Sequence, residues 1–235
     1  MIYAGILAGG TGSRMGSDIP KQFLPVAGRP IIIHTIEKFL SCPRFDHVYV
    51  AVVNEYLDYM NAIIEEHLKP EGRLTVIVGG SDRSGSLLRV IEEIRKNDND
   101  PDSILVSHDG VRPFVTADII GRNIDAALEY GAAGTAVPTT DTILCSADGT
   151  KLDSIPDRSA LFNAQTPQSF RIGWFEHDYG MLSEQQKESL TDACKIFVLS
   201  GREVRIVAGD AGNIKITTPF DMQLADAILA RADKE

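Results

Sequence analysis

The chain has 235 residues, of which 43% are hydrophobic and 24% charged, and its formal net charge is −10. This acidic balance argues against a nucleic acid or an anionic membrane as the main partner. Three scattered cysteines exclude a disulfide framework, and no apolar run approaches the ~20 residues that span a bilayer, so we expect a cytoplasmic protein.

Most of the chain alternates strand-like apolar runs with helical periodicity. Strands are expected at residues 2–7, 47–53, 74–78, 104–106 and 135–138. Helices are expected at residues 30–40, 55–68 and 86–95, and where Ile120, Ile124, Ala127 and Leu128 repeat at helical spacing. This rhythm predicts an α/β fold, with a doubly wound, mostly parallel, Rossmann-like sheet covered by helices on both faces.

The rhythm breaks at residues 139–158, where two strand-like runs flank the turn Ala147-Asp148-Gly149. We expect a protruding β-hairpin arm there. An isolated two-stranded ribbon is marginal in water, so the arm is predicted to contact a second copy of the chain. Beyond it, residues 203–207 and 214–216 are expected as short strands. The last helix is predicted to start at Thr218-Pro219 and to bury Phe220, Leu224, Ile228 and Leu229.

The glycine-rich segment after the first strand has the design of a phosphate-binding loop. Residues 9–16 contain four glycines, which bring backbone N–H groups against an anion, while Arg14 and Lys21 supply positive charge. A bland tight turn is the alternative. The loop lacks the Gly-Lys-Ser/Thr of a Walker A element, and Met15 stands where a dinucleotide motif needs glycine, so neither ATPase nor dinucleotide chemistry is favoured.

Three more segments at the expected rim of the sheet carry polar and small residues: 79–86, 108–113 and 165–168. Together with the glycine loop they suit a nucleoside triphosphate with a divalent cation. Asp109 is the candidate Mg²⁺ ligand, and the alternative is an Asp that caps the following turn. His108 is expected to be a hydrogen-bonded structural group. By themselves, Arg158 and Lys215 are no more than an ion-pair partner and a surface residue.

These motifs resemble those of the cytidylyltransferases that make CDP-linked polyols, over nearly the whole chain. Residues 7–15 with 20–22 resemble the family's triphosphate loop, residues 79–83 with Ser86 its cytidine site, and residues 108–113 its metal strand. The resemblance implies one cytidylyltransferase domain over residues 1–235, which uses CTP, a small polyol phosphate and Mg²⁺. It also implies a homodimer through the arm at residues 139–158.

The resemblance further assigns individual residues. The implied CTP contacts are Leu7, Ala8, Gly9, Gly10, Thr11, Gly12, Gly80, Ser81, Asp82, Arg83 and Ser86. The implied catalytic residues are Arg14 and Lys21 at the triphosphate, with Arg158 and Lys215 on the attacking phosphate, and the metal ligand is Asp109. The implied polyol-phosphate contacts are Arg112, Asp141, Thr142, Thr166, Thr191 and Asp192.

Two branches of this family differ in their acceptor. One makes CDP-ribitol from D-ribitol 5-phosphate for teichoic acid or capsule synthesis, and the other uses 2-C-methyl-D-erythritol 4-phosphate in the non-mevalonate isoprenoid route. Residues 7–10, Leu-Ala-Gly-Gly, replace the Pro-Ala-Ala-Gly usual in the isoprenoid branch, and Ala193 follows Asp192 where that branch tends to carry an acid. These details favour ribitol 5-phosphate, with a dehydrogenase that supplies it as a partner, and the isoprenoid acceptor stays open.

Two other classes compete with this interpretation. A non-catalytic nucleotide-binding module would hold CTP without releasing pyrophosphate, and it would give Asp109, Arg158 and Lys215 no reason to occur together. A hydride-transferring oxidoreductase is disfavoured by the failed dinucleotide motif.

Overall fold

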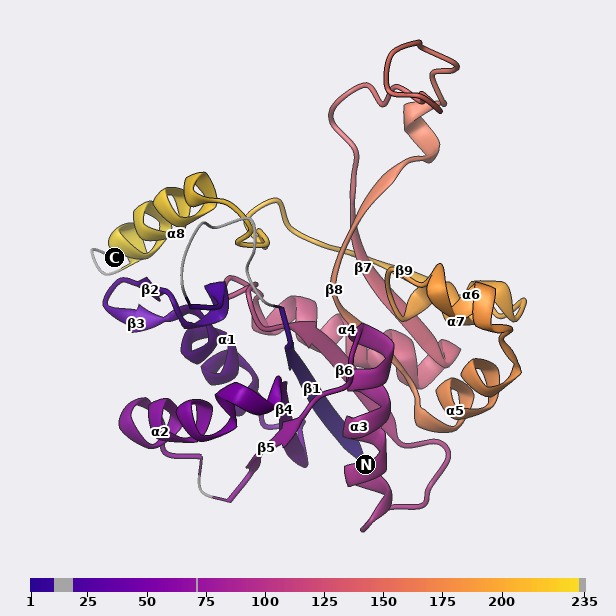
Figure 1. The fold of residues 1–235 in the computed structure, drawn as a ribbon. Coiled ribbons are helices and arrows are strands. Elements are labelled where there is room, and N and C mark those ends of the chain that lie inside the picture. Colours follow the sequence, from indigo (N-terminus) through magenta and orange to yellow (C-terminus); the bar gives the residue numbers. More distant parts are fainter. Residues whose placement is uncertain (11–18, 71, 233–235) are drawn as a thin grey trace.

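The computed structural model describes residues 1–10, 19–70 and 72–232 (Figure 1). Within these residues a seven-stranded sheet has the order β5-β4-β1-β6-β8-β7-β9. Its strands are β1 (Ile2–Ala8), β4 (His47–Val52), β5 (Leu74–Val78), β6 (Ile104–Asp109), β7 (Ala132–Pro138), β8 (Phe162–Arg171) and β9 (Arg205–Ala208). Neighbouring strands are parallel except at β8, which runs antiparallel to both β6 and β7. The predicted fold class is therefore confirmed.

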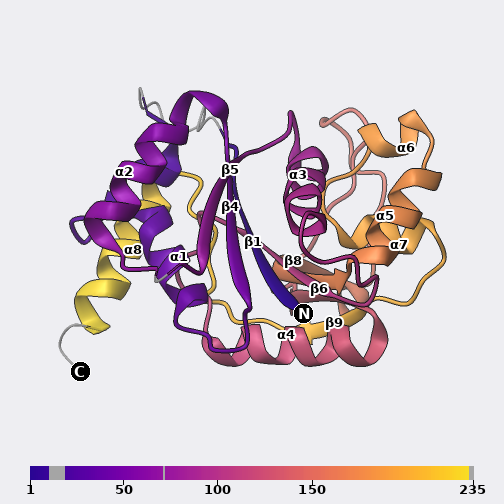
Figure 2. The ribbon, with the colours of Figure 1, turned by 90° about the horizontal axis from the view of Figure 1, so that it is seen from below.

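Helices cover both faces of the sheet (Figure 2). On one face α1 (Ile31–Leu40), α2 (Leu57–His67) and α4 (Ala117–Tyr130) share a hydrophobic core with the sheet, and on the other face α3 (Arg83–Arg95), α5 (Ile172–Met181) and α7 (Cys194–Leu199) share a second core. Strand β1 feeds both cores, because Ala4 and Ile6 point to the first and Tyr3 to the second. Burial on both faces explains the continuous apolar runs that the sequence shows.

Smaller elements complete the chain. They are the short strands β2 (Pro25–Val26) and β3 (Arg29–Pro30), the 3-10 turns η2 (Lys21–Phe23), η3 (Asn54–Tyr56) and η4 (Arg158–Ala160), and the helices α6 (Glu184–Glu188) and α8 (Pro219–Ala232). Helix α4 ends at Gly131, whose φ of 87° is left-handed, and a Cβ there would lie 2.2 Å from the Trp174 ring.

The last helix buries only part of the face that its sequence predicts. Phe220 and Leu224 are 72% and 39% exposed, whereas Ile228 is half-buried, Leu229 packs partly against a small core, and Ala225 is fully buried in it. That core is formed with Val26 and its neighbours on the β2 and β3 side, so the buried stripe of α8 is shifted toward Ala225. Helical periodicity identified the helix, but the element it packs against decided which stripe is buried.

The predictions of a strand at residues 214–216 and of a rim segment at residues 165–168 were wrong. Residues 214–216 form no strand, since the bond from Ile216 N–H to Val111 O (2.9 Å) is isolated and no ladder continues from it. Residues 165–168 lie inside β8 and not in a loop at the rim. The side chains of Gln165, Thr166 and Gln168 are buried in this strand because they find polar partners, so it lacks the apolar alternation by which strands are recognised.

The arm, residues 139–158, lies between the antiparallel strands β7 and β8 and protrudes from the sheet (Figure 1). The expected hairpin is reduced to one isolated bridge, between Cys145 and Ser154. Apolar side chains along it are exposed, with Leu144 at 61%, Leu152 at 57% and Ile155 at 56%. The protomer thus gives the arm no core of its own.

Candidate active site

A cavity of about 270 Å³ opens at the carboxyl ends of β1 and β6, where ligands of doubly wound sheets bind. Its lining joins segments far apart in the sequence. The lining residues are Leu7, Ala8, Gly9, Gly10, Lys21, Gln22, Gly80, Ser81, Asp82, Arg83, Ser86, Asp109, Val111 and Lys215. The structure therefore brings together all the described residues predicted to contact CTP, together with Lys21, Asp109 and Lys215. Thr11, Gly12 and Arg14 lie outside the described residues.

Gln22 locks the basic turn η2 onto the end of β1. Its side chain is 1% exposed, and Nε2 donates a hydrogen bond of 2.7 Å to the Ala8 carbonyl. The next residue, Phe23, is buried and packs edge-on against Tyr59, with the ring centroids 5.0 Å apart. These two anchors hold Lys21 at the cavity. No role was predicted for Gln22, although its place beside Lys21 in the segment Pro20-Lys21-Gln22 is a usable signal.

The opposite wall is a tight loop that closes onto the start of α3. A Cβ on Gly80 would lie 2.4 Å from the carbonyl carbon of Gly85, so only glycine fits there. Ser86 Oγ accepts the Gly80 N–H (3.1 Å) and donates to the Asp82 carbonyl (2.9 Å), while the Asp82 carboxylate caps the helix by accepting from Gly85 N–H (2.8 Å). The helix thus begins at Arg83, three residues earlier than predicted, which places Arg83 at the cavity.

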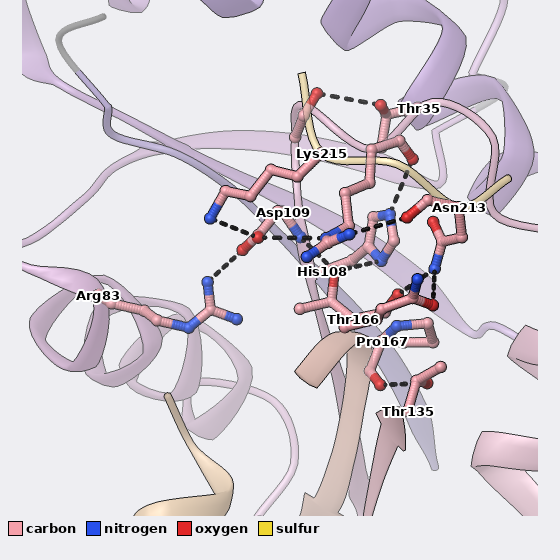
Figure 3. A network of polar contacts seen from close by, with 12 residues as sticks. Thr35, Arg83, His108, Asp109, Thr135, Thr166, Pro167, Asn213 and Lys215 are labelled. Carbon is pink, nitrogen blue, oxygen red and sulfur yellow. Dashed lines mark hydrogen bonds and ion pairs between the residues drawn. The ribbon is translucent and has the colours of Figure 1, made fainter. Parts of the chain in front are cut away.

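Asp109 is the charged centre of the site (Figure 3). It is 6% exposed, and Arg83 Nη1 contacts one carboxylate oxygen, while Lys215 Nζ lies 2.9 Å from the other and Arg112 Nε 3.5 Å from it. Burial alone would raise the pKa of this carboxyl, but Arg83, Lys215 and Arg112 hold the pKa well below its usual range. Three cations around one carboxylate leave the site positively charged in an acidic protein, which suits an anionic ligand.

The backbone of Asp109 is held by a chain of hydrogen bonds in which each donor points toward the Arg112 carbonyl (Figure 3). His108 is fully buried, and its Nε2–H donates to the Arg112 carbonyl (3.1 Å), so its Nδ1 is left as an acceptor. Thr166 Oγ1 donates to this Nδ1 (3.0 Å) and accepts the Asp109 N–H (3.1 Å). Burial lowers the pKa of His108 to about 4, which keeps the ring neutral as the chain requires. His108 is thus a structural group, as predicted.

Arg112 and Thr166, expected to contact the polyol phosphate, lie beneath the cavity wall. Arg112 is 8% exposed and Nη1 donates to the Asn213 carbonyl (2.8 Å), and Thr166 is 4% exposed within the chain described above. Asn213 in turn donates to the Thr166 carbonyl (2.8 Å). Neither predicted contact is among the residues that line the cavity. In this structure they hold Asp109 from beneath, a role that only the tertiary contacts show, and their contact with the polyol phosphate stays a prediction.

Comparison with known proteins agrees with this geometry. The family described as IspD, 2-C-methyl-D-erythritol 4-phosphate cytidylyltransferase, matches residues 2–231. The chain belongs to the IspD family. This makes it a CTP-dependent cytidylyltransferase, an enzyme of the transferase class.

Solved structures of similar proteins support the assignment over the full length. The 4-diphosphocytidyl-2C-methyl-D-erythritol synthase of Anaerococcus prevotii is 27% identical, with a TM-score of 0.78 over 98% of this chain and 96% of that one. The 2-C-methyl-D-erythritol 4-phosphate cytidylyltransferase of Francisella tularensis is 27% identical, with a TM-score of 0.79 over 96% and 98% of the two chains. That of Thermus thermophilus is 26% identical, with a TM-score of 0.72 over 98% and 100%.

The other predicted polyol-phosphate contacts of this IspD-family chain lie away from the cavity within one protomer. Asp141 and Thr142 are exposed in the arm, and Arg158 is exposed at its base, where Nη1 donates to the Thr140 carbonyl (2.9 Å). Thr191 is exposed, and the Asp192 carboxylate accepts the Lys195 N–H (2.9 Å) near the start of α7. Their roles at the substrate stay predictions.

The residues present fit a magnesium ion that arrives with the nucleotide. The part of the chain that the structure describes contains no group of three or more His, Cys, Asp or Glu side chains able to hold a metal. Mg²⁺ in nucleotide sites is commonly held by one or two carboxylates together with phosphate oxygens, and Asp109 supplies one such carboxylate. The same described residues include no helix long and apolar enough to cross a membrane.

Proposed function

We propose that this cytidylyltransferase joins CTP to D-ribitol 5-phosphate, giving CDP-ribitol and pyrophosphate for teichoic acid or capsule synthesis in the cytoplasm. The observation that carries the reaction is the cavity that Lys21 lines and in which Arg83 and Lys215 pair with the buried carboxylate of Asp109. This arrangement offers one metal ligand and several cations, as nucleotidyl transfer requires.

The environment of Ala193 supports ribitol 5-phosphate as the acceptor. This residue follows Asp192, at the position where the isoprenoid branch tends to carry an acid. Here Ala193 is 1% exposed, lies in a hydrophobic core, and donates its backbone N–H to the Gln168 side chain (3.1 Å). A carboxylate in this place would be buried among apolar groups at a considerable cost, so this position does not suit the acid that the isoprenoid branch tends to carry.

A second candidate acceptor is 2-C-methyl-D-erythritol 4-phosphate. The family description and the three solved structures all name the enzyme that uses this compound. On the comparisons alone it is the better supported acceptor. Both compounds are small polyol phosphates, and the chemistry at the α-phosphorus of CTP is the same for the two.

In the proposed mechanism the acceptor phosphate attacks the α-phosphorus of CTP in line. One bond forms between an acceptor phosphate oxygen and the α-phosphorus, the bond from the α-phosphorus to the bridging oxygen breaks, and pyrophosphate leaves with that oxygen. Lys21 stabilises the negative charge of the triphosphate, a role shared with Arg14, and Lys215 orients the attacking phosphate. Mg²⁺, when bound by Asp109, neutralises part of the triphosphate charge.

Parallel assays test the proposal. The protein is incubated with CTP and Mg²⁺ and either D-ribitol 5-phosphate or 2-C-methyl-D-erythritol 4-phosphate, and pyrophosphate release is followed. We expect a kcat/KM at least tenfold higher with ribitol 5-phosphate. A preference for the methylerythritol compound selects the second candidate, and CTP binding without pyrophosphate release with either compound points to a non-catalytic binding module.

The arm suggests how the site is completed. We propose that residues 139–158 form an arm subdomain that contacts a second copy of the chain, and that Arg158 grips the acceptor phosphate in the partner's cavity. The exposed apolar residues of the arm and the position of Arg158 at its base support this proposal. A dehydrogenase that supplies ribitol 5-phosphate is the further partner that this function implies.

Substitution of Arg158 tests the arm's role. We expect Arg158→Ala to weaken acceptor binding while CTP binding is kept, as measured by calorimetry for each ligand. Lys151→Ala, which changes an exposed cation at the tip of the same arm, is the matched control. Equal loss of affinity for both ligands would contradict the assignment.

A further inference from the structure

Arg83 carries hydrogen-bond donors that no described residue of the chain uses. Its guanidinium lines the cavity, and within the described part of the chain Nη1 is engaged, with Asp109. Nε and Nη2 are both buried, and neither has a partner among the described residues. The two form one side edge of the planar guanidinium, and their N–H bonds point the same way.

This unused edge is a preformed fork for an oxyanion. Buried polar groups are nearly always hydrogen-bonded in folded proteins, so two adjacent unpaired donors call for a ligand. The spacing of the guanidinium edge matches two oxygens of a phosphate, to which it donates two parallel bonds. Asp109 holds the other end of the group, so the fork is oriented before any ligand arrives (Figure 3).

The surroundings of Arg83 favour the acceptor phosphate over the triphosphate. Arg83 and Lys215 bind the two oxygens of the same carboxylate, so their charges flank one small volume beside Asp109. The positive charge of Arg83 is also felt at the start of α7. Burial and then Asp192 raise the pKa of the Cys194 thiol to about 12, and the charge of Arg83 opposes this rise. Residues 191 and 192, predicted to contact the polyol phosphate, belong to this same segment.

We propose that Arg83 is a substrate-binding residue for the acceptor: its side edge, Nε and Nη2, binds the phosphate of the polyol and holds it with Lys215 beside the α-phosphorus of CTP. This role differs from the nucleotide contact that the sequence predicts for Arg83. It rests on the proposed function, in that the acceptor is a polyol phosphate.

The lysine variant separates this role from a purely structural one. In Arg83→Lys the positive charge that pairs with Asp109 is kept, but the side edge is lost. We expect this variant to bind D-ribitol 5-phosphate at least tenfold more weakly, measured by calorimetry on protein saturated with a CTP analogue that cannot release pyrophosphate. Its affinity for CTP should stay within about twofold of wild type.

Controls and contrary outcomes are defined on the same helix. Arg89→Lys changes an exposed arginine of α3 that pairs with Glu92, and should leave both affinities unchanged. Arg83→Gln, which removes the charge but keeps polar atoms, should lose acceptor binding as well. Unchanged acceptor affinity in Arg83→Lys, or a loss confined to CTP, would overturn the proposal.

Titrations with two further ligands distinguish a failure of the Arg83 proposal from a failure of the proposed function. The same titrations are run with 2-C-methyl-D-erythritol 4-phosphate and with inorganic phosphate. If wild-type protein binds neither polyol phosphate, the proposed acceptors are wrong, and Arg83 is judged on inorganic phosphate alone. Weaker phosphate binding in Arg83→Lys then supports the oxyanion fork, and equal or absent binding in both proteins rejects it.

Discussion

The cavity around Asp109 and the arm differ in how firmly the fold holds their residues. At the cavity, residues from β6, α3 and the segment before α8 converge on one carboxylate that is 6% exposed, and a hydrogen-bonded chain through β8 holds its backbone. In the arm, the described residues form a single isolated β-bridge, between Cys145 and Ser154, and Leu144 and Leu152 are more than half exposed. The chain thus organises the charged centre by itself, whereas the arm leaves apolar side chains exposed, which is the basis of the proposal that it contacts a second copy.

The largest expected effect concerns the charge held at the cavity. We expect Lys21→Ala to lower kcat by two or more orders of magnitude, because removal of one preorganised contact to developing charge costs about 2.7–4 kcal/mol in comparable sites. Steady-state pyrophosphate release measures it. Lys38→Ala, on the exposed side of α1, is the matched control. A folded Lys21→Ala protein with near-normal turnover would remove Lys21 from the mechanism.

The second effect concerns the stability of the chain beneath the cavity. The folded protein lowers the pKa of His108 to about 4, so between the ordinary value near 6.5 and pH 4 the unfolded state binds the proton more readily. The free energy of unfolding should therefore decrease as the pH is lowered from about 6.5 to about 4, by up to about 3 kcal/mol from this group. Urea unfolding at a series of pH values measures the slope.

Two variants isolate the contribution of His108 from that of other titrating groups. His108→Asn should lose this part of the pH dependence, because no imidazole remains to take up a proton on unfolding. His67→Asn, at the end of α2, should keep the wild-type slope. An unchanged slope in His108→Asn would show that the buried ring is not the source.

The smallest effect on folding is expected in the arm. Surface substitutions usually change stability by less than about 0.5 kcal/mol, so the double variant Leu144→Ser, Leu152→Ser should leave the free energy of unfolding of the protomer nearly unchanged. Sedimentation should nevertheless show a shift from dimer to monomer. A clear loss of protomer stability, or a dimer that survives, would contradict the contrast between the two regions.

Sequence patterns correctly predicted the strands whose buried side chains are apolar. Strands β1, β4 and β5 lie within one residue of their predicted limits, because the mostly buried strands β1 and β4 and the half-buried edge strand β5 are nearly continuous apolar runs. Strand β8 escaped prediction because its buried side chains are polar and find their partners on β6, at Asp210 and Asn213, and at the start of α7. Hydrogen bonds between residues far apart in the sequence leave no periodic pattern in the sequence.

The sequence by itself determined the glycine loop, the basic residues beside it, the carboxylate at the end of β6 and the doubly wound order of elements. Only the tertiary structure decided that Lys215 reaches Asp109 from an extended segment and that Arg83 turns one edge to Asp109 and leaves the other without a partner among the described residues. It also decided that Arg112 and Thr166 act from beneath. The physical reason is that local burial and turn chemistry are written in neighbouring residues, whereas the pairing of buried charges depends on groups that meet only when the chain has folded.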